Sequence, residues 1–489
     1  MAAYWMTEAI PIPATALLPV VLFPLTGVLS TKAVCGQYVT AANMLFIGGL
    51  MVAAAVEHSG LHLRIALWVL IHMRAGVKWL MFGFMFVTMF LSMWISNTAT
   101  TALMTPIIER IIHILMEPSP LQTSTDGPAL GVSRQRLSAA LYISVAYAAN
   151  CGGTGTLTGT NPNLVLVGQL QELYGSKTGL TYTTFMMFGV PAMLLCTLIA
   201  WIWLVILFLG VRQFKCGTSG DARFAEVKRA LRQRYEDLGP ITFHEQMVTA
   251  LFLVVVVLWF TRDPLIVTGW LEVFSVRISD ATPAILVVVL MFMIPAKPNF
   301  KWWNKTRRDT TKVSEGLLTW KVVQEKVPWG VIILLGGGFA MARAAKDSGL
   351  SQLLGDQLTF ELPPVALVFI ICFFTAFLTE VSSNTATATI LLPVLAAVAQ
   401  RARINPLYLM LPTTLTCSYA FMLPVATPPN AIVHQAGQLK TSDMMRAGLL
   451  MNLLCVGVIT LLTNTLGVSI FELHTFPAWA NGTVAAPTE

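Results

Sequence analysis

Strongly apolar runs recur along the whole chain, and several of them are close to 20 residues long. A helix of about 20 apolar residues crosses the hydrocarbon core of a bilayer. Only 11% of the 489 residues are charged, 55% are hydrophobic, and the mean hydropathy is +0.70. A soluble domain carries about 25% charged residues. We therefore predict an all-α polytopic membrane protein and exclude a soluble globule.

The net charge of +7 does not indicate nucleic-acid binding, because the basic residues gather in loops between the apolar runs without an aromatic patch. The seven cysteines are widely spaced and mostly apolar in setting, so we interpret them as packing residues. The histidines show no metal-binding spacing, and no nucleophile–base arrangement is evident. Residues 153–159, GTGTLTG, lack the GK[ST] ending of a phosphate loop. We therefore expect no enzyme and no nucleic-acid partner.

One polar motif occurs twice within apolar sequence. Residues 95–106 read ISNTATTALMTP, and residues 381–394 read VSSNTATATILLPV. Both contain Ser-Asn-Thr-Ala-Thr, and in both a proline follows ten residues after the serine, at Pro106 and Pro393. Such a motif can simply cap helices or join helix pairs. Its duplication favours a two-fold repeated machine in which the polar side chains coordinate a ligand.

The basic loops predict how the chain crosses the membrane. Loops at residues 212–246 and 297–327 are basic and are assigned to the cytoplasm by the positive-inside bias. Counting backwards, both flanks of residues 77–116 are also cytoplasmic, and they carry Arg74, Lys78, Arg134 and Arg136. Residues 77–116 are therefore predicted to form a re-entrant hairpin with the first motif at its tip.

The second motif is predicted at the tip of another re-entrant hairpin, residues 363–400, which enters from the outside. The first repeat would then cover residues 1–182 and the second residues 183–446, in inverted orientation. Inverted repeats are typical of secondary transporters, with a site near the bilayer midplane. Further motif pairs occur in the same order: residues 8–11 with 280–283, 58–61 with 347–350, and 159–163 with 426–430.

The last predicted span covers residues 447–470, which places the C-terminal tail, residues 471–489, outside the cell. This tail contains Asn481-Gly482-Thr483, a glycosylation sequon. A glycosylated, extracellular C-terminus agrees with the charge count.

A hairpin tip has the chemistry to hold a cation beside an anion. Unpaired carbonyls end one helix and unpaired amides begin the next, and Ser, Asn and Thr add neutral oxygens suited to a hard cation. Ser92 and Thr379 each stand four residues before the motif serine, one helical turn earlier on the same face. Glu380 lies three positions before the second motif serine. It is interpreted either as a proton or cation ligand or as a satisfied structural carboxylate.

Five stretches carry a resemblance to a known family: residues 91–107, 153–163, 325–342, 382–394 and 419–433. With them, nearly the whole chain resembles the divalent anion–sodium symporter family, the sodium-coupled dicarboxylate and citrate carriers of animals. The resemblance implies a plasma-membrane homodimer, with a scaffold domain and a mobile transport domain in each protomer and elevator-type alternating access.

The resemblance also implies the site residues, with sodium ions as the co-transported cations. One sodium site would use Ser92, Ser96, Asn97 and Gly159. The other would use Thr379, Ser383, Asn384, Ala426 and Pro428. Substrate carboxylates would meet Ser96, Asn97, Thr98, Thr160, Ser383, Asn384, Thr385 and Thr427.

We therefore expect a sodium-coupled symporter of di- and tricarboxylates such as succinate, α-ketoglutarate or citrate. Neither motif contains an arginine to grip a carboxylate, which predicts strict sodium dependence. A sulfate or other oxyanion symporter of the same fold is the alternative. Family members begin with additional spans before the stretch that matches residues 1–8. The first repeat is thus expected to be N-terminally truncated, and a non-transporting isoform is a further alternative.

Overall fold

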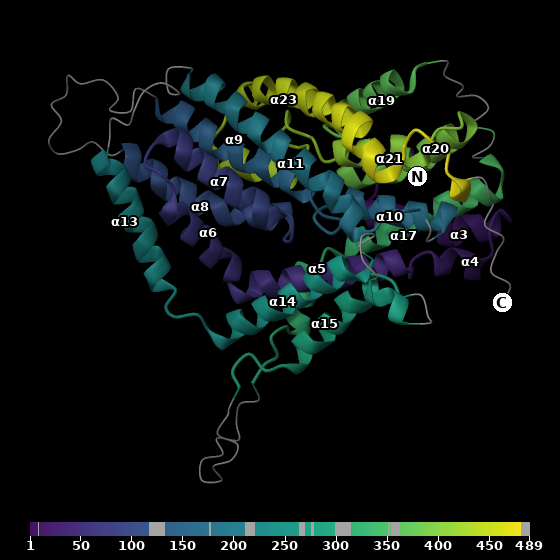
Figure 1. Cartoon of the computed structure of the whole chain (residues 1–489), viewed down its shortest axis with the longest axis horizontal. Coiled ribbons are helices and arrows are strands. Elements are labelled where there is room, and N and C mark those ends of the chain that lie inside the picture. Colours follow the sequence, from purple (N-terminus) through teal and green to yellow (C-terminus); the bar gives the residue numbers. More distant parts are fainter. Residues whose placement is uncertain are drawn as a thin grey trace, which may run out of the picture.

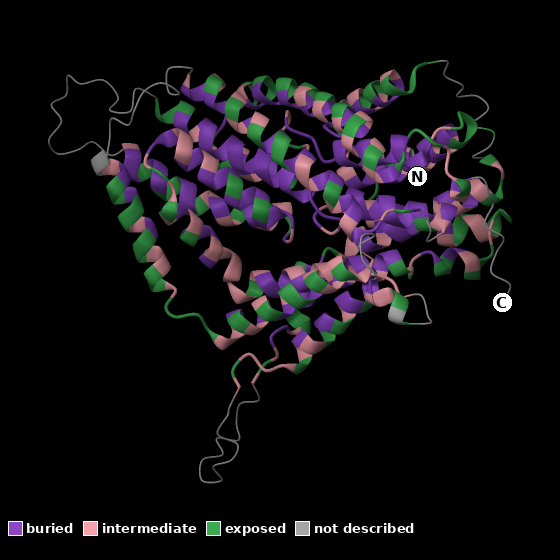
Figure 2. Ribbon diagram, in the orientation of Figure 1, coloured by how far each residue is buried: buried purple, intermediate pink, exposed green. Residues whose placement is uncertain are grey.

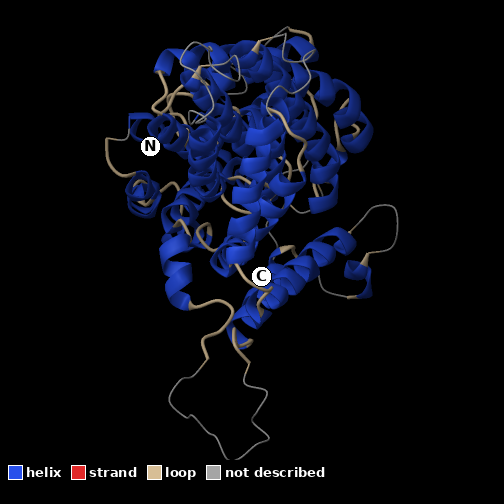
Figure 3. Ribbon diagram, turned by 90° about the vertical axis from the view of Figure 1, so that its left-hand side faces the viewer, coloured by secondary structure: helices blue, strands red, loops and turns tan. Residues whose placement is uncertain are grey.

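A computed structural model of the chain describes residues 1–7, 9–116, 133–175, 178–210, 221–263, 269–274, 278–298, 314–350, 353 and 362–480. Within these ranges the regular structure is helical, apart from one antiparallel bridge between Pro295 and Gly316 (Figures 1 and 3). Six of the described helical segments are long and apolar enough to cross a membrane. They are Thr31–Ser59, Asn97–Met116, Tyr182–Leu209, Phe243–Arg262, Trp329–Asp347 and Thr441–Phe471. The prediction of an all-α polytopic membrane protein is confirmed.

Both Ser-Asn-Thr motifs lie at the turn between two helices. In the first half, α7 (Val77–Ser92) leads into the motif and α8 (Asn97–Met116) leads out. In the second half, α19 (Pro364–Leu378) and α20 (Asn384–Arg401) form the same arrangement. Each outgoing helix begins at the asparagine of the motif, because Ser and Asn stabilise helix starts better than helix interiors.

Each half also contains a helix that is broken in the middle. In the first half, α9 (Arg134–Gly153) and α10 (Asn161–Tyr174) are separated by residues 154–160. In the second, α21 (Pro406–Thr416) and α22 (Pro428–Gly437) are separated by residues 417–427. Both outgoing helices carry proline in their first turn, where its missing N–H costs nothing. The two broken helices face the two hairpins, since α9 contacts α7 and α8, and α21 contacts α19 and α20.

The helices form two groups in space. One group consists of α5 (Ala41–Ser59), α14 (Phe243–Arg262) and α15 (Ala281–Met293), which contact one another in the lower part of Figure 1. The other contains both hairpins, both broken helices, α11 (Tyr182–Leu204) and α23 (Thr441–Leu462). Buried residues fill the interior of this larger group (Figure 2). Helix α17 (Trp329–Asp347) contacts α5 of the first group and α10 and α20 of the second.

Paired glycines allow these helices to approach closely. A Cβ built on Gly48 would lie 2.8 Å from the Cβ of Ala284 on α15. On α17, Cβ atoms at Gly337 and Gly338 would lie 2.5 Å from the Ala16 carbonyl oxygen and 2.2 Å from Cγ2 of Thr389. No side chain fits at such distances, so these glycines serve helix contact.

The first apolar run, residues 9–27, reads in the sequence as one proline-rich span, but the structure divides it. It forms two short helices, α2 (Ile12–Ala16) and α3 (Leu18–Leu25), which meet at Leu17. Pro19 follows in the first turn of α3, and Pro24 lies inside α3. Proline cannot donate a backbone hydrogen bond and clashes with the preceding turn, which explains the break.

Helix α6 (Leu61–His72) is amphipathic in sequence, which is typical of a helix at the membrane interface, and it carries a buried ion pair. Arg64 is only 7% exposed, and its Nε lies 3.0 Å from Oε1 of Glu245 at the start of α14. The same guanidinium donates to the Gly239 carbonyl, just after α13 (Asp221–Asp237). Arg64 therefore joins α6 to α14 and to the end of the basic loop helix.

We expect Arg64→Ala to destabilise the protein by about 3 kcal/mol, because it leaves the Glu245 carboxylate buried without its cation. Thermal unfolding of the purified protein in detergent measures this. Arg232→Ala is the matched control: its partner Glu236 lies 3.9 Å away on the exposed face of α13, where an ion pair contributes little. Equal melting temperatures for the two variants would contradict the assigned role of Arg64.

Candidate functional site

The two hairpin tips share one arrangement of three oxygen atoms. At the first tip, Oγ of Ser92 lies 2.5 Å from Oδ1 of Asn97 and 2.9 Å from the carbonyl oxygen of Ala149. At the second, Oγ1 of Thr379 lies 2.8 Å from Oδ1 of Asn384 and 2.7 Å from the carbonyl oxygen of Cys417. The hydroxyl-bearing residue stands five positions before the asparagine in both.

In each cluster, acceptor oxygens outnumber the hydrogens available for donation. A hydroxyl has one hydrogen to donate, yet each of these hydroxyls faces two acceptor oxygens. The acceptor carbonyls lie near the C-terminal ends of α9 and α21, where the helix dipole is negative. Three convergent oxygens that share one hydrogen suit a small hard cation. Side-chain and backbone oxygens supply this without a buried full charge.

Two equivalent asparagines hydrogen-bond the backbone at the breaks in the two broken helices. The side-chain amide of Asn163 donates to the carbonyls of Gly153 (3.1 Å) and Thr156 (2.7 Å). That of Asn430 donates to the carbonyls of Ala420 and Leu423, both at 3.0 Å. Each asparagine thus bonds the residues seven and ten positions before it. The repeat therefore extends to individual hydrogen bonds. Sequence reasoning noted these asparagines only as the last letters of GTNPN and ATPPN.

Three predicted sodium ligands of the first tip come together around Gly153. A Cβ built on Gly153 would lie 2.9 Å from Oδ1 of Asn97 and 3.1 Å from the carbonyl oxygen of Gly159. Ser92 contacts the same Asn97 oxygen. The absence of a side chain at Gly153 is therefore required for Asn97 and the Gly159 carbonyl to lie this close to the backbone of residue 153.

The other predicted residues of the first tip lie further out. Ser96 is exposed, and its Oγ accepts the amide of Ala99 at 3.2 Å, which caps α8. Thr98 is also exposed, and Thr160 is half-buried as the N-cap of α10.

At the second tip most of the predicted residues are more enclosed, although Pro428 is exposed. Ser383 is a half-buried N-cap of α20, and Thr385 is buried. Thr427 is buried and caps α22 by accepting the amide of Asn430, while Ala426 and Pro428 flank it. Within the described residues, no hydrogen bond joins the two motifs to each other.

The two halves meet through the broken helices. Nδ2 of Asn150, on α9, lies 3.3 Å from both the Ala420 carbonyl and Oγ1 of Thr427. The hydroxyl of Tyr147 donates to the Phe421 carbonyl at 3.2 Å. Helix α22 in turn contacts α8 and α9. The first-half broken helix therefore packs directly on the second, and Asn150 is a contact that sequence reasoning missed.

Glu380 is a buried carboxylate that anchors backbone. It is 3% exposed and accepts the amides of Phe421, Met422 and Leu423 at 2.7, 2.9 and 3.0 Å. Nδ2 of Asn452 on α23 donates a fourth bond at 2.8 Å. Four donors around two carboxylate oxygens favour the structural interpretation of this residue over a cation or proton ligand. The equivalent first-half position is Met93, whose carbonyl accepts the hydroxyl of Thr156 at 2.6 Å.

Fold and site together define a helical membrane protein built from two copies of a hairpin and a broken helix. A sequence profile described as the sodium:sulfate symporter transmembrane region matches residues 1–473. The chain belongs to this family.

Several relatives align with almost the whole chain. It is 43% identical to the Na(+)/citrate cotransporter of Rattus norvegicus, over 98% of this chain and 91% of that protein. It is 41% identical to the Na(+)/dicarboxylate cotransporter 3 of Homo sapiens, over 98% and 89%. It is 44% identical to solute carrier family 13 member 2 of Mus musculus, again over 98% and 89%.

A solved structure shares the fold. The YdaH transporter of Alcanivorax borkumensis superposes with a TM-score of 0.54, covering 89% of this chain and 87% of that one, at 14% identity. This likeness supports the helical transporter fold.

We expect Glu380→Gln to destabilise the protein by about 2 kcal/mol, because the neutral amide loses charge-assisted bonds and turns a donor toward backbone donors. Thermal unfolding in detergent measures the loss. Glu325→Gln on the exposed surface is the control and should leave stability unchanged. A Glu380→Gln protein as stable as the parent would show that the amide cradle is not the role of this residue.

Proposed function

We propose that this chain is a sodium-coupled secondary active symporter of di- and tricarboxylates such as succinate, α-ketoglutarate and citrate, acting at the plasma membrane. The observation that carries the proposal is the pair of equivalent oxygen clusters, Ser92 with Asn97 and Thr379 with Asn384. Relatives named as sodium cotransporters of citrate and dicarboxylates, 41–43% identical over almost the whole chain, support the same function.

Each tip would bind one sodium ion. The first ion would be held by oxygens of Ser92, Ser96, Asn97 and Gly159, and the second by oxygens of Thr379, Ser383, Asn384, Ala426 and Pro428. The contacts of Ser92 with Asn97 and of Thr379 with Asn384 support the part of each set that these residues form. When a cation enters, the hydroxyl hydrogen can rotate away, and the cation then contacts the three oxygens.

The substrate would lie between the tips, with its carboxylates near the N-termini of α8 and α20. Hydroxyl and amide donors would come from Ser96, Asn97, Thr98, Thr160, Ser383, Asn384, Thr385 and Thr427. Neither motif sequence contains Lys or Arg. Helix-end amides are weak partial charges, so the two bound sodium ions would supply most of the positive charge that offsets a dicarboxylate. This makes substrate binding depend on sodium.

The two groups of helices suggest how access alternates. The group of α5, α14 and α15 would act as the scaffold of a homodimer. The group with both hairpins would move as an elevator across the membrane. The proposed topology keeps residues 1–182 and 183–446 as inverted repeats and an extracellular C-terminus glycosylated at Asn481, a residue outside the described part of the chain.

A sulfate or oxyanion symporter is the second candidate, because the matching family profile is described by sodium and sulfate. Competition separates the two: excess sulfate should leave uptake of labelled succinate unchanged in a carboxylate carrier and abolish it in a sulfate carrier.

Replacing sodium by choline should reduce uptake of labelled succinate or citrate to the level of cells that lack the protein, because the carboxylates lose their counter-charge. Uptake into expressing cells, with surface labelling as the control for expression, measures this. Uptake that persists in choline would contradict sodium coupling.

Removing one cluster hydroxyl should raise the sodium concentration for half-maximal uptake about tenfold, equal to the loss of one strong polar contact. The variants are Ser92→Ala and Thr379→Val. Thr379→Ser keeps the hydroxyl and should behave as the parent. Ser144→Ala is a second control, because Oγ of this buried serine bonds only its own helix, at the Leu141 carbonyl. Unchanged sodium dependence in both variants that lack the hydroxyl would contradict the assignment of the hairpin tips as sodium sites.

A further inference from the structure

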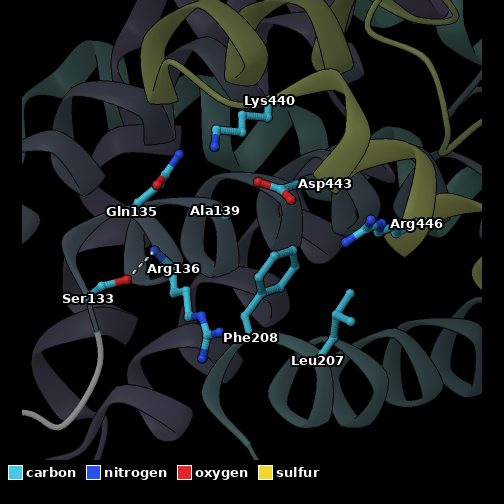
Figure 4. A pocket seen from close by; sticks show the side chains of 9 residues that line it. All are labelled: Ser133, Gln135, Arg136, Ala139, Leu207, Phe208, Lys440, Asp443 and Arg446. Atoms are coloured by element: carbon cyan, nitrogen blue, oxygen red, sulfur yellow. Dashed lines mark hydrogen bonds between the residues drawn. The ribbon is translucent and has the colours of Figure 1, made fainter.

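A cavity of about 280 Å³ lies away from the hairpin tips, where three helix ends meet. The start of α9, the start of α23 and the π-helical end of α11, Val205–Leu209, enclose it (Figure 4). The residues around it are Ser133, Gln135, Arg136, Ala139, Leu207, Phe208, Lys440, Asp443 and Arg446.

The cavity carries an excess of positive charge. Three cations, Arg136, Lys440 and Arg446, line it together with a single carboxylate, that of Asp443. Figure 4 shows the side chains of Lys440, Asp443 and Arg446 reaching into the space between the helices. Among the residues that the structure describes, none of the three cations forms an ion pair, either with Asp443 or with another carboxylate. An anion would therefore meet three cations that no described carboxylate neutralises.

Helix ends add to the positive potential. The amide of Arg136 bonds Oγ of Ser133, so the start of α9 is already capped. The start of α23 has no side-chain cap, and Lys440 itself is its N-cap residue. Free amides at this end favour an anion beside the lysine.

The surroundings of the cavity favour a lipid over a free ion. Leu207 and Phe208 form an apolar wall at the end of α11. On the same two helices, exposed apolar residues continue toward the membrane interior: Ile202 and Ile206 on α11, and Met445 and Leu449 on α23, each 39–45% exposed. Trp203 on α11 holds the two helices together by donating to the Ala447 carbonyl at 3.0 Å. A polar headgroup in the cavity would thus be followed by an apolar surface for its chains.

The cavity lies at the membrane face that the basic loops assign to the cytoplasm. Helix α11 ends there just before the loop that contains α13, and α9 begins there with Arg134. Basic pockets between membrane helices at this face bind phosphorylated lipid headgroups.

We propose that this cavity binds the headgroup of an anionic phospholipid of the cytoplasmic leaflet, of the phosphorylated inositol class. Arg136, Lys440 and Arg446 contact phosphate oxygens, Arg in the bidentate manner that its planar group allows. Asp443 and Gln135 accept the ring hydroxyls, which gives the lone carboxylate a role in an otherwise basic cavity. The bound lipid joins α9 of the first half to α23 of the second, next to the bond from Oγ of Ser138 to the Gly437 carbonyl (3.2 Å).

Thermal unfolding of the full-length protein in detergent tests this with three probes: dioctanoyl phosphatidylinositol 4,5-bisphosphate, dioctanoyl phosphatidylcholine and inorganic phosphate. We expect a saturable rise in melting temperature with the phosphoinositide alone. The same rise with inorganic phosphate would overturn the lipid assignment in favour of a free-anion site. The same rise with phosphatidylcholine would overturn the role of the headgroup.

Charge variants test the residues. Replacing Arg136, Lys440 and Arg446 together by Gln should weaken the apparent affinity for the phosphoinositide about 100-fold, from the typical contribution of one cation near a lipid surface. Arg134→Gln is the matched control, because this neighbouring exposed arginine does not line the cavity. Its affinity should stay that of the parent.

The melting temperature without lipid reports whether the triple variant folds. If it does not, the single variants Lys440→Gln and Arg446→Gln replace it, each expected to weaken binding about fivefold. Unchanged affinity in all of these variants would overturn the proposal.

Discussion

The structure depends on satisfying backbone that is not helical within a membrane, where water cannot supply hydrogen bonds. Residues 154–160 and 417–427 interrupt helices in apolar surroundings, and protein side chains hold both segments. The side chains of Asn163 and Asn430 each donate to two backbone carbonyls, and the Glu380 carboxylate accepts three backbone amides. Because these groups are satisfied by the protein, the oxygens that face the hairpin tips can remain available for an ion.

The two halves hold their broken helical segments by different interactions. In the second half a buried charge, Glu380, ties the broken segment to the hairpin and to α23 through Asn452. In the first half the equivalent link is a neutral bond from Thr156 to the Met93 carbonyl. A charge-assisted network is stronger than one neutral bond but costs more when one partner is lost. The two broken segments are thus equivalent in geometry and unequal in how firmly they are held.

Local pattern in the sequence predicted the all-helical class, and both repeated motifs lie at turns between helices. The family resemblance implied Ser92 and Thr379, their spacing of one helical turn from the motif serine agreed with it, and both contact the motif asparagine. What pattern could not predict are contacts between distant residues, such as Arg64 with Glu245, 181 positions apart, or Asn150 with Ala420, 270 positions apart. Periodicity reports which face of a helix is apolar and carries no information about the helix that will cover it.

A flux ratio tests most directly whether two equivalent sodium sites hold one carboxylate substrate. Purified protein in proteoliposomes would be given labelled sodium and labelled succinate together, and both uptakes would be followed at early times. Two sodium sites predict succinate-dependent entry of at least two sodium ions per succinate, and a lower ratio when Ser92 is replaced by Ala. Succinate entry without any accompanying sodium would contradict it.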